Sequence, residues 1–141
     1  MTAAPTTTIP AGFEPVFRSS PYLDLIGPIY NKGSGAELKI GWRVEPKHTN
    51  ARGGLHGGVI ATVADIALGY TLATTTQPPT RLVTASLTID FVGGAEPGVW
   101  IETSSEVLKL GGRLAFANAH FWNGEQRIAR ASGVFLVVTN S

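Results

Sequence analysis

Cysteine is absent from this chain of 141 residues. The absence excludes disulfide bonds, thiolate catalysis and cysteine metal ligands, and it is typical of a reducing compartment. Histidine is scarce, with three residues in all, and neither His48 nor His120 has a partner at metal-binding spacing. We therefore predict structural roles for these two histidines and no metal site.

Charged residues are few, with 11 Lys and Arg against 10 Asp and Glu and a formal net charge of +1. No basic run of the kind that follows a phosphate backbone is present, which argues against a nucleic-acid partner. Long apolar runs are also missing, and residues 1–10 lack the basic start and apolar core of a secretory signal. We expect a cytoplasmic protein that binds neither nucleic acid nor a membrane.

Apolar residues make up 43% of the chain, enough for a single domain, which we assign to residues 19–141. Residues 1–18 are rich in Thr, Pro and Ala and favour a poorly ordered arm or an extended strap; we predict a flexible N-terminal arm. Ser20, Pro21 and Gly27 have the positions of an N-cap, a first helical residue and a helix end, so a short helix is expected there.

Hydrophobic periodicity divides the remaining chain into one long helix and five strands. Residues 58–74 form an apolar segment too long for a strand, which predicts a helix. Alternation predicts strands at 37–44, 83–91, 99–110, 113–122 and 125–138, with hairpin turns at Gly111-Gly112 and Asn123-Gly124. The predicted class is α+β, an antiparallel sheet of five to six strands wrapped around a central helix. Because this helix is apolar on nearly every side, part of it should meet another subunit.

The segment HTNARGGLHGGVIATVAD, from His48 to Asp65, is the most specific part of the chain. His56-Gly57-Gly58 follows a loop and precedes the helix, so it predicts a helix N-terminus. The first amides there lack internal partners and carry the positive end of the helix dipole, which suits them to a polarised oxygen. Asp65 lies in an otherwise apolar segment, and an acid that loses water in this way is a functional candidate.

Helix geometry separates these two groups. Gly57 and Asp65 are eight residues apart, about 12 Å at a rise of about 1.5 Å per residue. A general base must lie within about 3 Å of the proton it takes, or one water away, so the two groups should not serve one centre within a single chain. Two helices running antiparallel across a two-fold axis would bring them together twice, once at each of two equivalent sites.

The motif HTNxxGxLHGGxxxxxxD resembles the signature of hotdog-fold acyl-CoA thioesterases of the phenylacetic-acid-degradation (PaaI) type, in the 4-hydroxybenzoyl-CoA thioesterase superfamily. The order of strand, long helix and four strands is that of the hotdog fold. VTASLTIDFVGGAEPG resembles the second strand of the family, and VLKLGGRLAFANAHFWNGEQRIARASGVFLVV resembles its closing hairpins. The resemblance covers roughly residues 20–138.

This resemblance implies hydrolysis of an acyl-CoA thioester to a free acid and CoA. Asp65 would act as general base or nucleophile, from the opposite subunit, while the Gly57 amide polarises the thioester carbonyl. Asn50 would help to position the water or the carbonyl group, His56 would support that corner of the site, and Thr84 would help to position water.

The resemblance also implies how the rest of the substrate binds. CoA would lie along the turn formed by Lys109, Gly111, Gly112 and Arg113, where glycines allow close approach and cations supply charge; Arg52 and Arg81 are further candidates. No separate cofactor is expected, because CoA is part of the substrate. The minimum active unit would be a homodimer, assembled into a homotetramer. Five aromatic residues are candidates for an acyl pocket or for the core: Trp42, Tyr70, Phe91, Phe116 and Trp122.

Two other functions remain open from the sequence. A hotdog hydratase or dehydratase would use His56 and Asp65 on adjacent substrate carbons, and would change enoyl absorbance without releasing thiol. A non-catalytic acyl-CoA binding domain would bind acyl-CoA saturably without turnover.

Overall fold

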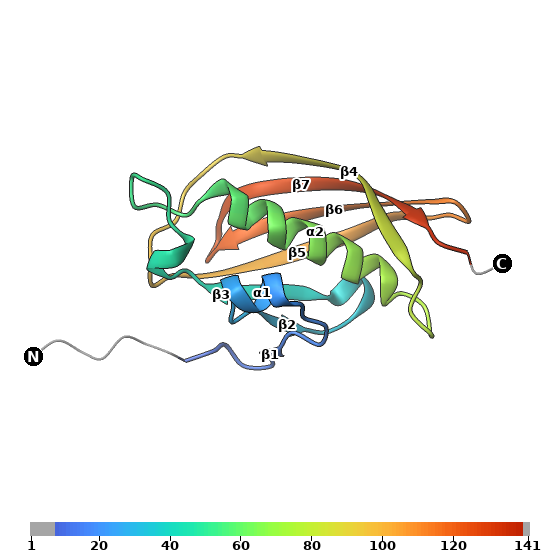
Figure 1. Ribbon diagram of the computed structural model, residues 1–141, viewed down its shortest axis with the longest axis horizontal. Helices are drawn as coiled ribbons and strands as arrows, with labels where there is room; N and C mark the ends of the chain where they lie inside the picture. Colours follow the sequence, from blue (N-terminus) through green and yellow to red (C-terminus); the bar gives the residue numbers. More distant parts are fainter. Residues whose placement is uncertain (1–7, 140–141) are drawn as a thin grey trace, which may run out of the picture.

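A seven-stranded antiparallel sheet curves around one long helix in the computed structural model, which describes residues 8–139 (Figure 1). The strand order is β1-β2-β3-β5-β6-β7-β4. The strands are β1 (Glu14–Pro15), β2 (Tyr30–Lys32), β3 (Lys39–Arg43), β4 (Leu82–Phe91), β5 (Trp100–Leu110), β6 (Leu114–Asn123) and β7 (Gln126–Val137). The helices are α1 (Pro21–Ile26) and α2 (Gly57–Ala73), with short 3-10 turns at Gly35–Glu37 and Pro46–His48. The predicted α+β hotdog architecture is confirmed.

Two short strands were not predicted from the sequence. β1 has two residues and β2 has three, which is too short for an alternating pattern to be recognised. Their pairing makes part of the predicted flexible arm an extended strap instead. Phe13 packs edge-on against Trp100 with ring centroids 5.0 Å apart, and the Phe17 amide donates to Asn31 Oδ1 at 2.8 Å. Residues 1–7 of that predicted arm lie outside the described residues.

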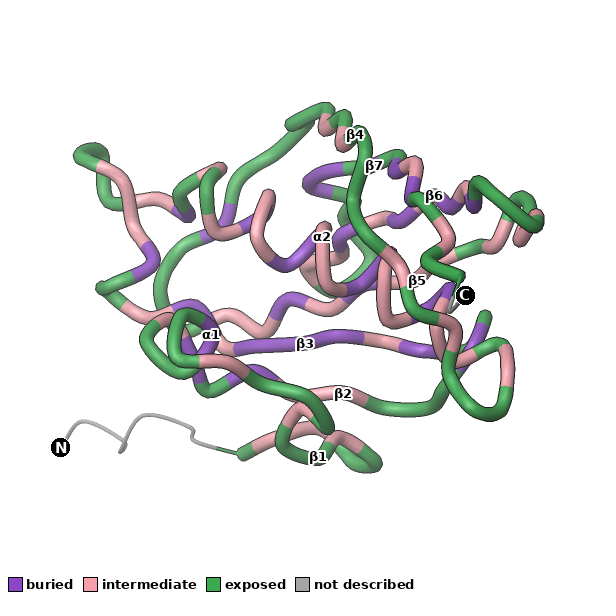
Figure 2. The backbone as a smooth tube through the Cα atoms, turned by 45° about the vertical axis from the view of Figure 1, so that its right-hand side comes forward, coloured by how far each residue is buried: buried purple, intermediate pink, exposed green. Residues whose placement is uncertain are grey.

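The short helix predicted after the arm is confirmed. Ser20 caps α1 by accepting a hydrogen bond from the Leu23 amide, Pro21 occupies the first turn, and the helix ends before Gly27. Most of α1 is exposed, and Leu23 is its buried residue (Figure 2).

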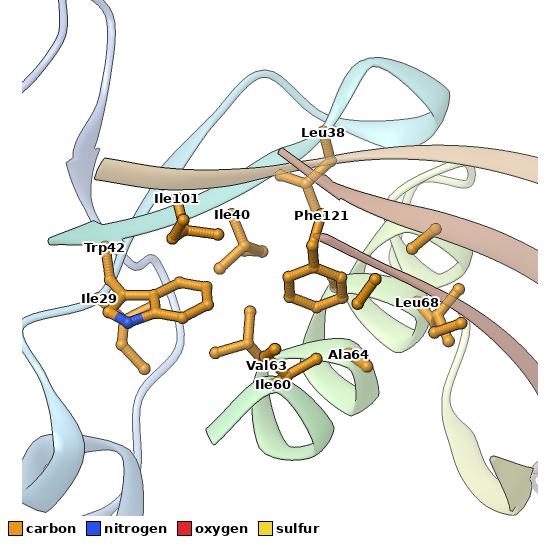
Figure 3. Packing of buried hydrophobic residues seen from close by; sticks show 14 of the residues in the cluster. Ile29, Leu38, Ile40, Trp42, Ile60, Val63, Ala64, Leu68, Ile101 and Phe121 are labelled. Atoms are coloured by element: carbon orange, nitrogen blue, oxygen red, sulfur yellow. The ribbon is translucent and has the colours of Figure 1, made fainter. Parts of the chain in front are cut away.

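The core lies between the concave face of the sheet and one side of α2 (Figure 3). Trp42 and Phe121 meet edge-on there, with ring centroids 6.2 Å apart. Along β6 the inward residues Ala115, Ala117 and Ala119 are at most 1% exposed, and their small side chains let α2 approach the sheet closely. Removing a large side chain from such a core costs about 2–5 kcal/mol.

The opposite side of α2 remains open in the single chain, and it is the side left for the predicted contact with another subunit, which stays a prediction. Its buried residues recur at helical spacing on the side toward the sheet: Ile60, Val63, Ala64, Ala67, Leu68, Thr71 and Leu72. Asp65 and its neighbours Ile66, Gly69 and Tyr70 are only half-buried. β4 ends the sheet beside this open face, and its outer edge pairs with no other strand of residues 8–139. An open strand edge next to an open helix face is a surface ready for pairing.

Candidate active site

Asn50 organises the loop that leads into α2. Its Oδ1 accepts hydrogen bonds from the backbone amides of Arg52 at 2.9 Å and Gly54 at 3.2 Å. The backbone amide of Asn50 donates to Gly54 O at 2.8 Å. Gly53 between them has a φ of +86°, a conformation that favours glycine. The side-chain oxygen of Asn50 thus already accepts two hydrogen bonds within the loop, whereas its Nδ2 donates to no described residue.

His56 is the N-cap of α2. Its Nδ1 accepts the Gly58 amide at 2.7 Å, and its carbonyl accepts the Val59 amide at 3.0 Å. Glycine at position 58 is needed for this cap, because a Cβ there would lie 2.9 Å from His56 Nδ1. His56 thus accepts from the second and third backbone amides of α2, those of Gly58 and Val59. The first amide, that of Gly57, has no acceptor among residues 8–139. The donor at the positive end of the helix dipole is therefore the Gly57 amide.

Asp65 lies two turns further along α2 and pairs with Thr84 of β4. The Thr84 hydroxyl donates to Asp65 Oδ1 at 2.6 Å, the length of a charge-assisted bond. The bond fixes one carboxylate oxygen and leaves the other free to accept a proton. Both residues were candidates from the family resemblance, which did not predict their contact with each other. Asp65 is half-buried in the single chain, less than its apolar sequence context predicted.

A groove runs along the open side of α2 past Asp65, and we call it the α2 groove. It consists of two adjoining cavities that share Asp65, Ile66, Tyr70 and Thr84. Its walls come from the segment 17–23 on one side and from β4 on the other. Sequence reasoning missed the first wall, because the Thr- and Pro-rich composition of the arm favoured disorder. The available signal was the pair of aromatic residues at positions 13 and 17.

Tyr70 connects the groove to the N-terminal strap. Its hydroxyl donates to Arg18 O at 2.9 Å, and its ring lies 5.1 Å from that of Phe17. Burial raises the pKa of Tyr70 above its usual 10.0; Arg18 opposes this shift and the Asp65 carboxylate adds to it.

The two halves of the predicted site do not meet within one chain. Asn50 and Gly57 line a separate hollow with Phe91, and this hollow shares no residue with the α2 groove. The Phe91 ring covers the helix start so closely that a Cβ at Gly57 would lie 3.0 Å from it. Arg52 lines the hollow, whereas Arg81 lines the α2 groove.

The predicted CoA-binding turn joins β5 to β6. Gly111 is required for its shape, since a Cβ there would lie 2.8 Å from Leu114 O, while Gly112 has open space around it. Lys109 and Arg113 are exposed, and neither side chain is hydrogen-bonded or ion-paired with another described residue. Leu114, Leu136 and Val83 lie in one row across three strands, so the turn is about 10 Å from the start of β4, beside Thr84.

The two remaining histidines, His48 and His120, line neither the α2 groove nor the hollow at Gly57. His48 is buried; its Nε2 donates to Ile26 O at 2.6 Å and its Nδ1 accepts the Glu45 amide at 2.9 Å, which confirms a structural role. Burial lowers the pKa of His120 below its usual 6.5, and Arg127 lowers it further. Within residues 8–139, no three His, Cys, Asp or Glu side chains are grouped as metal ligands.

Of the five aromatic candidates, two border the half-sites. Tyr70 lines the α2 groove and Phe91 lines the hollow at Gly57. Trp42 belongs to the core. Phe116 and Trp122 alternate along β6 with its buried inward residues and so lie on the outer face of the sheet.

Comparison with known proteins identifies the family and agrees with the fold. Residues 52–129 match the family described as the thioesterase superfamily. A protein of Pseudomonas aeruginosa named as a putative esterase is 46% identical over 128 residues, which is 90% of this chain and 96% of that protein. Human acyl-coenzyme A thioesterase 13 is 38% identical over 82 residues, 57% of each chain. The solved structure of PaaI from the phenylacetic acid degradation operon of E. coli superposes with a TM-score of 0.69 over 76% of each chain, at 18% identity, which shows a shared fold.

The chain belongs to the thioesterase superfamily and has the hotdog fold. It is an enzyme of the thioester hydrolase class, as its motif predicted. No helix within the described part of the chain is long and apolar enough to cross a membrane.

Proposed function

We propose that this protein hydrolyses acyl-CoA thioesters at a site shared between two subunits, with Asp65 from one and the Gly57 amide from the other. The observation that carries the proposal is the free Gly57 amide, left without an acceptor by the His56 cap. The Asp65–Thr84 pair in the α2 groove complements it. The name of the human relative supports acyl-CoA as the substrate class.

The two half-sites supply what thioester hydrolysis requires. Asp65 takes a proton from water, and the water oxygen forms a bond to the carbonyl carbon. The electron pair of the carbonyl moves to its oxygen, where the Gly57 amide and the helix dipole stabilise the charge. The carbonyl then re-forms as the C–S bond breaks, and the leaving thiolate of CoA takes up the proton held by Asp65, so that a free acid and the CoA thiol result. In the nucleophilic alternative, the Asp65 carboxylate itself attacks the carbonyl carbon, the C–S bond breaks and the CoA thiolate leaves, and water then hydrolyses the resulting anhydride to the free acid and the Asp65 carboxylate.

Neighbouring residues assist these steps in the proposed mechanism. Thr84 holds one oxygen of the carboxylate, so the other is aimed at water. The uncommitted Nδ2 of Asn50 donates to the water or the carbonyl oxygen. His56 acts through the Gly57 amide by capping the helix, and its use of Nδ1 for that cap leaves this nitrogen unavailable for hydratase chemistry. The mechanism needs no cofactor, because CoA enters as part of the substrate.

A homodimer is the minimum unit in this proposal. The open edge of β4 and the open face of α2 are adjacent, and antiparallel pairing of both would bring each Asp65 to the partner's Gly57. Two dimers then form a tetramer. The CoA phosphates bind Lys109 and Arg113 at the turn of Gly111 and Gly112, and the enzyme acts in the cytoplasm.

Thiol release from a panel of acyl-CoA substrates tests the activity. Conversion of enoyl-CoA without thiol release, or saturable binding without turnover, would favour the hydratase or the binding domain instead. Light scattering measures the assembly, and a strictly monomeric active enzyme would contradict the shared site.

Mixing two inactive variants tests the sharing directly. In a heterodimer of Asp65→Asn and Asn50→Ala chains, one site carries both lesions and the other carries neither. Random exchange between equal amounts of the variants should therefore restore about a quarter of wild-type activity. If both half-sites came from one chain, every site would carry a lesion and no activity would return.

A further inference from the structure

The α2 groove has two lobes of different chemistry on either side of Asp65. The first lobe lies toward α1 and is lined by Tyr22, Leu23, Ala61, Ile66 and Leu87, with Asp65 the charged residue at its inner end. The second lobe follows the last turns of α2 and includes Arg18 and Arg81. The lobes therefore differ in charge although they share the Asp65 carboxylate.

The charged lobe lies on the side of the CoA-binding candidates. Its lining includes Val83 and Val138, at the end of the sheet where the β5–β6 turn carries Lys109 and Arg113. An anionic phosphate arm entering from that turn passes over cations in the second lobe. The acyl group, which is apolar, then has the uncharged first lobe on the other side of Asp65.

Tyr22 forms the outer wall of the first lobe. It projects from α1, and its hydroxyl is hydrogen-bonded to Thr62 Oγ1 of α2 at 2.9 Å. Thr62 is itself fixed by donating to Gly58 O at 3.0 Å. Tyr22 is 56% exposed in the single chain, so it is held across the lobe by its hydrogen bond to Thr62 and is not part of the core.

We propose that the lobe between α1 and α2 receives the acyl group of the substrate, and that Tyr22 determines selectivity for long or bulky apolar acyl groups. The inference rests on the proposed thioesterase function. An acetyl group ends near Asp65 and does not reach the ring, whereas a longer acyl group lies against it. Tyr22 is therefore a specificity-determining residue that affects binding of the acyl group and does not affect the chemical step.

Steady-state kinetics of Tyr22→Ala over acyl-CoA substrates from acetyl to long-chain and aryl groups tests the proposal. The ratio of kcat/KM for long over acetyl substrates should fall about tenfold through KM. A tenfold change corresponds to about 1.4 kcal/mol, which is the burial of about two CH₂ groups. Activity on acetyl-CoA should stay within about twofold. Tyr22→Phe keeps the ring and removes the bond to Thr62, so it should retain most of the selectivity.

Two other variants serve as controls. Leu25→Ala alters a residue of the same helix that is 74% exposed and does not line the groove, and its acyl profile should match the wild type. Phe17→Ala removes an aromatic ring of similar exposure, 54%, from the charged lobe. It should change KM by the same factor for every acyl group, because all share the CoA arm.

Three outcomes would overturn the proposal. The first is an unchanged acyl profile in Tyr22→Ala, and the second is a profile that shifts in Phe17→Ala instead. The third is dissociation of the dimer by Tyr22→Ala with equal loss on all substrates, which would mean that Tyr22 contributes to the subunit contact and not to acyl binding. A wild-type protein that releases no thiol from any acyl-CoA would instead refute the thioesterase function itself.

Discussion

The two half-sites on α2 differ in how their polar groups are held. At the helix start, side chains accept hydrogen bonds from the backbone. Asn50 accepts from two backbone amides of its loop, and His56 accepts from the Gly58 amide. In the middle of the helix, two side chains from different elements are hydrogen-bonded to each other, since Thr84 of β4 donates to Asp65 of α2. The first arrangement presents a fixed backbone donor, and the second presents a carboxylate, so each half supplies what the other lacks.

This difference suggests separate consequences of mutation. Changes at the helix start should act through the local structure that aims the Gly57 amide. Changes at the Asp65–Thr84 pair should act on the chemical step and leave stability nearly unaffected, because the pair lies in an open groove.

Asp65→Asn should have the largest effect. The amide keeps the size of the side chain but cannot take a proton, so kcat should fall about thousandfold, in line with loss of a general base or nucleophile. Stopped assays of thiol release measure this loss, and circular dichroism with light scattering controls for fold and assembly. A variant with near wild-type turnover would refute the role of Asp65.

Thr84→Val should have the next largest effect. Loss of the hydroxyl frees the carboxylate to rotate, and kcat should fall about tenfold at similar KM. Thr84→Ser keeps the donor and serves as the matched control, with activity close to wild type. If kcat fell equally in both variants, the effect would come from altered packing and not from loss of the hydrogen bond.

His56→Ala should reveal the contrasting behaviour of the helix start. Loss of the N-cap should lower the free energy of unfolding by about 1 kcal/mol, measured by urea denaturation, and turnover should fall with it as the Gly57 amide loses its orientation. His56→Ser restores a capping oxygen and should recover the stability. If stability is unchanged in His56→Ala, the cap does not hold the helix start.

Titration of Tyr70 gives the smallest and most local test of the Asp65 groove. Its pKa is raised above 10.0, mainly by burial, with a contribution from Asp65. Because folding favours the neutral phenol, the stability it contributes is full below pH 10.0 and is lost as the pH rises toward the folded pKa. Phenolate absorbance, with Tyr70→Phe as the reference, should show a lower midpoint in Asp65→Asn than in wild type. An unchanged midpoint would indicate that the carboxylate charge does not reach the ring.

Much of the fold was predictable because its long elements repeat a simple pattern. Apolar and polar residues alternate over nine residues of β4, from Val83 to Phe91, and α2 is mostly apolar over seventeen, so both elements were predicted to within one residue at each end. β1 and β2 were missed, because a strand of two or three residues has no period to detect. The packing of Phe17 on Tyr70 was missed for a related reason, since the contact joins positions 53 residues apart.

The candidate site was predicted in its parts and not in its contacts. Residue spacing on one helix was enough to separate Gly57 from Asp65, because helix rise is nearly constant. It did not reveal that the His56 cap leaves the Gly57 amide as the donor without an acceptor, nor that Tyr22 of α1 reaches Thr62.

The sequence by itself determined the class of fold, the helix that carries both half-sites, and their separation along it, because these follow from local periodicity and helix geometry. Only the tertiary structure decided which groups complete each half-site. Thr84 meets Asp65, and the segment 17–23 walls the groove, through contacts between elements that are distant in the chain. Such contacts depend on how the sheet curves around α2, which no local pattern of residues encodes.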